Sequence, residues 1–251
     1  MIFYKSADEI ELMRKSGRVV AEVLNYVAER IKPGISTLDV EAYALEKMKS
    51  ISPEIVPSFK GYMGFPASIC VSLNKEVVHG IPSVKRIVKD GDIVSIDFGV
   101  FYNGYHGDAA ISVIAGKGTE EAKRLLEVTQ QSLYEGIKEA KIGNRLFDIS
   151  AAIQDFVESH GYSVVKDFVG HGIGQNMHES PQVPNFGERG TGIKIADGLT
   201  IAIEPMVNAG TSDVDVLSDG WTAVTSDGSL SAHFEHTVAI TKNGTFILTE
   251  I

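Results

Sequence analysis

Cysteine is nearly absent from this sequence of 251 residues, and its scarcity excludes two kinds of site. The only cysteine is Cys70, so the chain forms no internal disulfide and no cluster of thiolate metal ligands. Long hydrophobic runs are also missing, because no apolar stretch approaches the roughly 18 residues that predict a membrane-spanning helix. The N-terminal residues Met1–Lys5 lack the basic start and apolar run of a signal peptide. We therefore expect a cytoplasmic protein with no membrane association.

A surplus of basic charge is missing too. The chain has 23 Lys and Arg residues against 33 Asp and Glu residues, which gives a net charge of −10. Binding along a phosphate backbone needs clustered Lys and Arg, so we expect no specific nucleic-acid partner. An acidic protein suits a substrate that carries a positive amino group.

Helical signals occur in two pairs along the chain. Ser6 and Glu9 form a capping box before a periodic apolar pattern that ends at Lys32-Pro33-Gly34. A second helix is predicted from Thr37, with Asp39 in its first turn. Two further helices are predicted from Thr119 to about Lys141 and from Leu146 to His160, and strand-like runs follow around Val164, Ile201, Val238 and Phe246.

The joint between the helices of each pair has a similar sequence. Lys32-x-Gly34-x-x-x-Leu38-Asp39-Val40 resembles Lys141-x-Gly143-x-x-x-Phe147-Asp148-Ile149. We predict a single catalytic domain over residues 1–251 with an internal pseudo-repeat, approximately 1–116 and 117–251. The alternative is that both segments are ordinary helix-loop-helix joints.

A hairpin carries the best pair of candidate metal ligands. The strand Ile93–Val100 runs to Asn103-Gly104, a dipeptide typical of tight hairpin turns, and Tyr105–Ile114 is the returning strand. With a two-residue turn Asp108 faces Gly99, and Asp97 is its diagonal neighbour on the same face. Asp97 interrupts an apolar strand, where an unpaired charge is costly to bury. The alternative is that both aspartates face solvent, as most aspartates do.

Three more candidate ligands follow at a distance along the chain. His171 lies within Gly170-His171-Gly172-Ile173-Gly174, where the glycines permit close backbone approach. Glu204 and Glu235 each adjoin apolar strand-like runs, and His233 and Thr237 are expected on the strand face of Glu235. Each of these residues alone also fits a structural role. Together with the hairpin aspartates they supply four carboxylates and one imidazole, which balance two divalent ions such as Co, Mn, Fe or Zn.

With these residues the sequence resembles the type I methionine aminopeptidases of the pita-bread fold family, and the resemblance covers nearly the whole chain. The motifs that carry it are Phe65–Cys70, Val78-His79-Gly80-Ile81-Pro82, Asp97 with Gly107-Asp108, Gly170–Gly174, Ile203-Glu204-Pro205-Met206 and Phe234–Thr237. The resemblance implies an α+β fold of two pseudo-symmetric halves, each with two helices packed on a curved antiparallel sheet. It implies removal of the initiator methionine from nascent proteins when the second residue is small. Water activated by two divalent metal ions would attack the first peptide bond.

The resemblance also assigns roles to individual residues. It makes Asp97, Asp108, His171, Glu204 and Glu235 the metal ligands, with Asp108 and Glu235 bridging two metals. Glu204 would also handle the proton of the attacking water, and His79 and His178 would contact the substrate at the scissile bond. The methionine pocket would be lined by His79 and His178 together with Phe59, Tyr62, Phe65, Cys70, Met177 and Trp221, although the aromatic residues also fit plain core packing.

Two pocket positions depart from the family pattern. Met177 stands where the family usually has an aromatic residue, and Phe59 stands where it often has a smaller one. We expect Met177 at the pocket entrance, where a flexible thioether would tolerate bulkier ligands.

The resemblance implies nascent polypeptide N-termini as partners, transient ribosome association and a monomer. Three alternatives stay open from the sequence. They are an Xaa-Pro peptidase of the same fold, a non-catalytic binding module, and a thiol protease built on Cys70 and His79.

Overall fold

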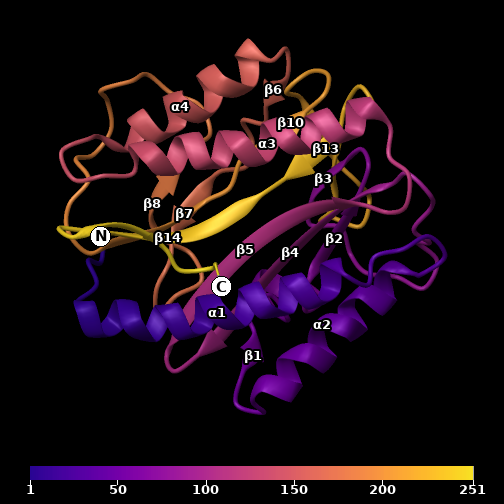
Figure 1. The fold of residues 1–251 in the computed structure, drawn as a ribbon, viewed down its shortest axis with the longest axis horizontal. Coiled ribbons are helices and arrows are strands. Elements are labelled where there is room, and N and C mark those ends of the chain that lie inside the picture. The colour runs from indigo at the N-terminus through magenta and orange to yellow at the C-terminus, as the bar shows by residue number, and fades with distance from the viewer. Residues whose placement is uncertain (251) are drawn as a thin grey trace.

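The helices begin where the sequence supplies capping groups. The computed structural model describes residues 1–250, and in that range it contains four α-helices: α1 (Ala7–Ala28), α2 (Thr37–Ile51), α3 (Glu120–Glu139) and α4 (Leu146–Ser159) (Figure 1). Ser6 and Glu9 form the capping box of α1, and the Thr119 side chain accepts from the backbone of α3. The predicted starts are confirmed, but α1 ends at Ala28, earlier than Lys32.

The joints inside the two helix pairs have the same local geometry. Gly34 and Gly143 both have positive φ, 95° and 101°, which glycine adopts without a side-chain clash. The N-cap backbone N–H of α2 donates to Asp39 and that of α4 donates to Asp148, each at 2.7 Å. On these matched joints we propose that the whole chain is one catalytic unit with an internal repeat.

The described strands form one large antiparallel sheet and two small ones. The large sheet has the order β1-β4-β5-β14-β9-β7-β8, with β2 paired to β4 and β15 to β14. The small sheets have the orders β13-β10-β6 and β11-β12-β3. The strand bounds are β1 (Val56–Pro57), β2 (Cys70–Leu73), β3 (Glu76–Val78), β4 (Ile93–Tyr102), β5 (Tyr105–Ile114), β6 (Ser163–Val164), β7 (Gly170–Gly172), β8 (Glu179–Val183), β9 (Leu199–Ile203), β10 (Met206–Asn208), β11 (Val214–Val216), β12 (Ala223–Thr225), β13 (Ser231–His233), β14 (Glu235–Thr241) and β15 (Gly244–Ile247), and a short 3-10 helix spans Tyr62–Gly64.

The helices bury the apolar residues of the large sheet. In Figure 1 α1 and α2 lie along one side of the central strands, and α3 and α4 lie along the other. Ile96 and Phe98 of β4 belong to a fully buried cluster with residues of α1 and α2, and Val238 of β14 belongs to a second cluster with residues of α3 and α4. Because side chains alternate along a strand, Asp97 points away from the cluster that holds Ile96 and Phe98. β4 therefore carries Asp97 on the face opposite that cluster.

The apolar run before the C-terminus is two strands, whereas the sequence suggested one. β13 ends at His233 and β14 begins at Glu235, with a break at Phe234. The Phe234 N–H donates to the carbonyl of Pro205 at 3.3 Å, and Pro205 makes the matching break between β9 and β10. Proline donates no backbone hydrogen bond, so it ends the pairing at that point. His233 thus belongs to a different sheet from Glu235 and Thr237.

None of the helices in residues 1–250 is both long and apolar enough to cross a membrane.

Candidate active site

The hairpin β4–β5 places two aspartates on one face, as its sequence predicts. Gly99 pairs with Asp108, and Asp97 pairs with Ala110. Ala110 also pairs with Glu235 of β14, so this small residue stands between two carboxylates in neighbouring strands. A Cβ atom at Gly99 would lie 3.0 Å from Asp108 Oδ1. The small residues at 99 and 110 therefore leave room for the carboxylates to converge.

Thr237 attaches β14 to β5 beside Asp108. The Thr237 hydroxyl donates to the backbone carbonyl of Asp108 at 2.8 Å and accepts from its backbone N–H at 3.1 Å. These two bonds fix the spacing of the strands that carry Asp108 and Glu235. The Asp108 backbone therefore has no freedom to draw its carboxylate away from Glu235.

His171 approaches Asp108 and Glu235 from a third strand, β7. A Cβ at Gly170 would lie 2.4 Å from the Ala202 carbonyl oxygen, and one at Gly172 would lie 2.4 Å from that of Ser180, so glycine is required on both sides of the histidine. His171 Nδ1 lies 2.9 Å from the Gly172 carbonyl oxygen and acts as the donor to it. Nε2 then faces the carboxylates with its lone pair, as metal-binding imidazoles do.

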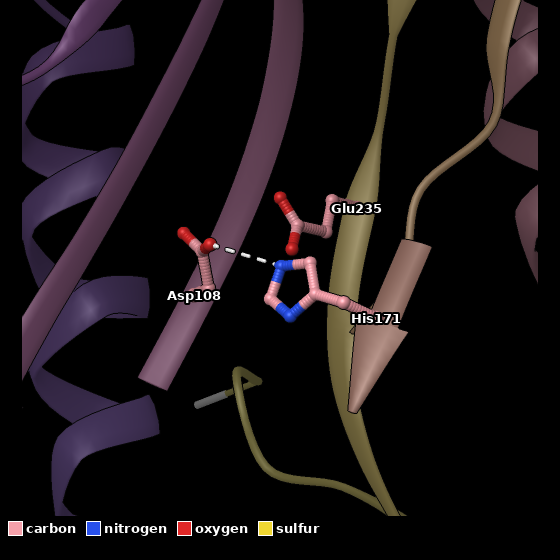
Figure 2. A group of neighbouring side chains, drawn as sticks. All are labelled: Asp108, His171 and Glu235. Atoms are coloured by element: carbon pink, nitrogen blue, oxygen red, sulfur yellow. Dashed lines mark ion pairs between the residues drawn. The ribbon is translucent and has the colours of Figure 1, made fainter. Parts of the chain in front are cut away.

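Three carboxylates lie close to this imidazole, those of Asp108, Glu204 and Glu235. His171 Nε2 lies 3.9 Å from Asp108 Oδ2 and 3.7 Å from Glu204 Oε1. Figure 2 shows Asp108, His171 and Glu235 pointing toward a common point from β5, β7 and β14. One ligand atom of each of these three residues lies within 4.8 Å of the others. The predicted ligands therefore meet in space although they are far apart in sequence.

Several carboxylate oxygens in this group are buried without a hydrogen-bond partner. They are Asp97 Oδ1, Asp108 Oδ1 and Glu235 Oε1. A buried polar atom without a partner is costly, and a buried charge is costlier still. A cation among these oxygens would remove that cost, so the observed donor set fits a divalent metal.

Burial of several carboxylates close together raises the pKa values of the acids. Burial, together with neighbouring carboxylates, raises the pKa of Asp97, Glu204 and Glu235 well above the usual range. Burial raises the pKa of Asp108 to about 7. Burial lowers the pKa of His171 to about 3, so its imidazole is neutral and available as a ligand. Without a cation the cluster holds protons that a bound metal would displace.

The other two predicted histidines lie beside the ligands. His178 packs against His171 with 4.1 Å between ring centroids and 60° between ring planes, and it meets Tyr62 edge-on at 5.1 Å. His79 meets the edges of Phe168 at 5.4 Å and Trp221 at 6.3 Å. Burial, and then His178, lowers the pKa of His79 to about 4. His79 also has a φ of 60°, an uncommon conformation for a residue other than glycine.

A cavity of about 490 Å³ connects these groups with an apolar wall. All the predicted pocket residues line it: Phe59, Tyr62, Phe65, Cys70, Met177 and Trp221. Met177 is only 3% exposed and packs with Phe65 and Cys70, so it is part of the buried wall and the expectation of an entrance position is wrong. Met63, which is 80% exposed, lines the mouth instead. Met177 is therefore buried by its contacts with the other pocket residues, whereas Met63 is exposed.

The cavity also includes residues that the sequence did not single out as site residues. They are Met63, Val78, Phe168, Val169, Gly170, Glu179, Ser180, Gln182, Met206 and His233. Most carry no local signal, because they reach the cavity only through the pairing of short strands. His233 is the exception, since a histidine two residues before a candidate ligand suggested a shared surface.

A model of metallopeptidase family M24 matches residues 11–242. The chain belongs to metallopeptidase family M24. It is 53% identical over 249 residues to a methionine aminopeptidase of Clostridium acetobutylicum, with 99% of each chain covered. The crystal structure of a methionine aminopeptidase from Thermotoga maritima matches it with a TM-score of 0.97 and 50% identity over 100% of both chains. A prolidase from Pyrococcus furiosus matches with a TM-score of 0.77 at 23% identity, covering 99% of this chain and 65% of that one, which shows the fold alone.

These comparisons confirm the predicted resemblance and the pita-bread α+β fold. They also confirm the class of enzyme, a hydrolase of the metalloexopeptidase type. The alternative of an Xaa-Pro peptidase is disfavoured, because the chain is 53% identical to a methionine aminopeptidase and only 23% identical to the prolidase.

Proposed function

We propose that this M24 peptidase removes the initiator methionine from nascent proteins when the second residue is small, with two divalent metal ions at the carboxylate cluster. The observation that carries the proposal is the convergence of Asp108, His171 and Glu235 beside an apolar cavity. The relatives named methionine aminopeptidase support the choice of substrate.

The metal would be held by Asp97, Asp108, His171, Glu204 and Glu235, with Asp108 and Glu235 shared between two ions. Their unpartnered oxygens and the central position of Asp108 in the cluster support this assignment. Four carboxylates and one neutral imidazole suit Co, Mn, Fe or Zn. Bound divalent ions would supply Lewis-acid charge that makes water a better nucleophile at neutral pH and polarises the scissile carbonyl.

The remaining steps fall to side chains of this chain. Glu204 would accept the proton of the attacking water and pass it to the leaving amine, since its carboxylate adjoins the cluster and is only 14% exposed. His79 and His178 would hydrogen-bond the substrate at the scissile peptide and stabilise the charge that develops on it. Both rings line the cavity beside the cluster, which supports these roles.

The apolar wall would hold the methionine side chain. Phe59, Tyr62, Phe65, Cys70, Met177 and Trp221 form a surface of rings and sulfur atoms, which suits a flexible thioether. A second residue of the substrate would lie between the cluster and His79, where Phe168 and Trp221 already crowd the ring. A large side chain there would displace the scissile carbonyl, and a displacement of about 1 Å costs roughly 10²-fold in rate.

Methionine release from the peptides Met-Ala-Ser and Met-Leu-Ser tests the proposal. Protein stripped with a chelator should be inactive, and added Mn or Co should restore cleavage of Met-Ala-Ser. Cleavage of Met-Leu-Ser should stay at least roughly 10²-fold slower, by the cost of displacing the carbonyl. Full activity after verified metal removal would contradict the metal requirement, and equal rates on the two peptides would contradict the size rule.

We further propose that the enzyme acts as a monomer in the cytoplasm on nascent polypeptide N-termini, with transient ribosome association. A single chain supplies every residue of the proposed site, which supports a monomer. Sedimentation with purified ribosomes and light scattering of the free enzyme test these two points.

A further inference from the structure

His233 is a fully buried histidine that the proposed chemistry leaves without a task. Its side chain is 2% exposed, and it lines the cavity that holds the carboxylate cluster. Its Nε2 atom has no hydrogen-bond partner. A buried donor or acceptor left unpaired is unfavourable in free energy. The ring therefore needs a partner on the cavity side.

Two strand breaks bring His233 to Glu204. His233 ends β13 and pairs with Met206, the first residue of β10. Glu204 and Pro205 form the break between β9 and β10. The Asn185 side chain donates to the Glu204 carbonyl at 3.0 Å and fixes the backbone there. The backbone position of Glu204 is therefore fixed, and its carboxylate orientation depends on what its side chain contacts.

The Glu204 carboxylate lies between two imidazoles. Its Oε1 atom is 3.7 Å from Nε2 of His171, and its Oε2 atom is 3.8 Å from Nε2 of His233. A side-chain rotation that shortens the second distance by roughly 1 Å gives a normal N–H···O hydrogen bond. Such a bond would use the unpaired Nε2 of His233 and would hold Oε1 toward the ligand cluster.

We propose that His233 is a positioning residue, whose Nε2–H group holds Oε2 of Glu204 and so orients the carboxylate that binds metal and moves the proton. This inference rests on the role of Glu204 in the proposed function. His233 acts through Glu204, because its Nε2 atom lies 3.8 Å from Oε2 of that residue. Residues that orient a metal ligand typically contribute roughly 10-fold to 100-fold in metal affinity or activity. We expect an effect of this order when the His233 hydrogen bond is removed.

Two substitutions separate the hydrogen bond from the packing. His233→Leu fills the space without a donor, whereas His233→Gln keeps an N–H donor near the position of Nε2. Calorimetric titration of metal-free protein with Mn should give roughly 10-fold to 100-fold weaker binding for His233→Leu. The kcat for Met-Ala-Ser should fall by a similar factor with little change in KM. His233→Gln should restore both quantities to within about threefold of the parent, because it restores the donor.

His236→Gln is the matched control. His236 is a largely buried histidine with a side chain 14% exposed, but its Nδ1 atom bonds the Thr249 hydroxyl at 2.8 Å, and it does not line the cavity. Its substitution should lower the melting temperature and leave Mn affinity unchanged. The melting temperatures of both His233 variants show whether each is folded before its affinity is compared.

Two results would overturn the inference. One is parent-like Mn affinity in folded His233→Leu, because this would show that the Glu204 carboxylate is oriented without His233. The other is a raised KM with unchanged Mn affinity, which would make His233 a contact to substrate. A parent protein that binds Mn without releasing methionine would contradict the proposed function instead, and the affinity comparison between variants would still test His233.

Discussion

At the scale of single residues, the histidines of the cavity differ in what they face. Nε2 of His171 faces Asp108 and Glu204, whereas the His79 ring is packed against the edges of Phe168 and Trp221. Burial gives both a low pKa, about 3 for His171 and about 4 for His79, so both rings are neutral at physiological pH. The two rings therefore differ in partners and not in charge, and their substitutions should have different consequences.

We predict that His171→Ala loses bound metal and that His79→Ala does not. Removing the ring of His171 removes a neutral donor from the cluster, so activity should fall with metal content. In His79→Ala the kcat should fall by roughly 10²-fold or more, the scale of a proton-transfer or oxyanion contact. Metal analysis of the purified variants, beside steady-state rates, checks both. Metal loss in His79→Ala would show that the separation of roles is wrong.

Cys70 should be chemically inert in the folded protein. Burial, and then the charge of Asp97 opposite it on β4, raises the pKa of the thiol well above its usual range. Since the thiolate is the reactive form, alkylation by iodoacetamide near pH 8 should be at least about tenfold slower than in urea. Fast alkylation of native protein, with loss of metal-independent activity, would favour the thiol protease alternative.

At the scale of elements, the sequence predicts the features of helices and hairpins that depend on neighbouring residues alone. The capping residues Ser6 and Thr119 mark the starts of α1 and α3, and Asn103-Gly104 sets the register of β4 and β5. Each signal depends on residues within one turn or one hairpin. The register is the most informative of them, because it places Asp97 and Asp108 on one face before any tertiary contact is known.

The short strands could not be predicted in this way. β7, β10, β12 and β13 have three residues each, and their partners lie far away in the chain. No periodic pattern fits in three residues, so only tertiary pairing defines them. Four of the five ligand candidates were found because acids in or beside strand-like runs need an explanation, and His171 was found by its flanking glycines. His233 was not placed in the site, because its sheet and its neighbour Glu204 follow from the breaks at Pro205 and Phe234.

The N-terminal segment is an element of the site although it has no regular structure. Ile2 forms a bridge with Ser180, and the Lys5 backbone N–H donates to the Gly198 carbonyl at 2.7 Å. The Lys5 ammonium pairs with Glu179, and the two side chains are only 4% and 3% exposed. Glu179 follows His178 directly and lines the cavity. This buried ion pair therefore ties the start of the chain to a segment that lines the cavity.

We predict that Lys5→Met destabilises the protein by about 3–5 kcal/mol, because it leaves the buried Glu179 carboxylate without its cationic partner. Replacing Glu179 by Met in the same protein should recover part of the loss, since no unpaired charge remains. Urea unfolding measures both. Lys123→Met is the control, because its pair with Glu120 is exposed and worth about 0–1 kcal/mol. Equal effects of Lys5→Met and Lys123→Met would contradict the buried-pair account.

At the scale of the whole molecule, the carboxylate cluster links stability to pH and metal. A carboxyl group whose pKa is raised on folding, as that of Asp108 is to about 7, makes the folded state bind protons more readily than the unfolded one. Its contribution to stability is complete at low pH and is lost as the pH rises through that value. Divalent ions compete with those protons, so metal should stabilise the fold most where the acids are ionised.

We predict that metal-free protein loses on the order of 1 kcal/mol of unfolding free energy between about pH 6.5 and about pH 8.5 relative to Asp108→Asn, which lacks the titrating group. The buried histidines act in the opposite sense, because their lowered pKa values keep them neutral in the folded state while the unfolded state binds protons near pH 6.5. The comparison with Asp108→Asn removes their contribution, since both proteins contain the same histidines. The rise in melting temperature on adding Mn should grow over the same range. Parallel stability profiles of the two metal-free proteins in this window would contradict the linkage.

The position of β14 between β5 and β9 has a consequence for how the chain is made. Asp97 and Asp108 belong to the first half, whereas Glu235 arrives on a strand that pairs with both halves. During synthesis the first hairpin emerges long before its neighbour, and β5 then presents an unpaired edge that invites association with other chains. Pairing over such a sequence separation is slow. A chain stalled before Phe234 would lack a ligand and expose that edge, so truncated products should be both inactive and prone to aggregate.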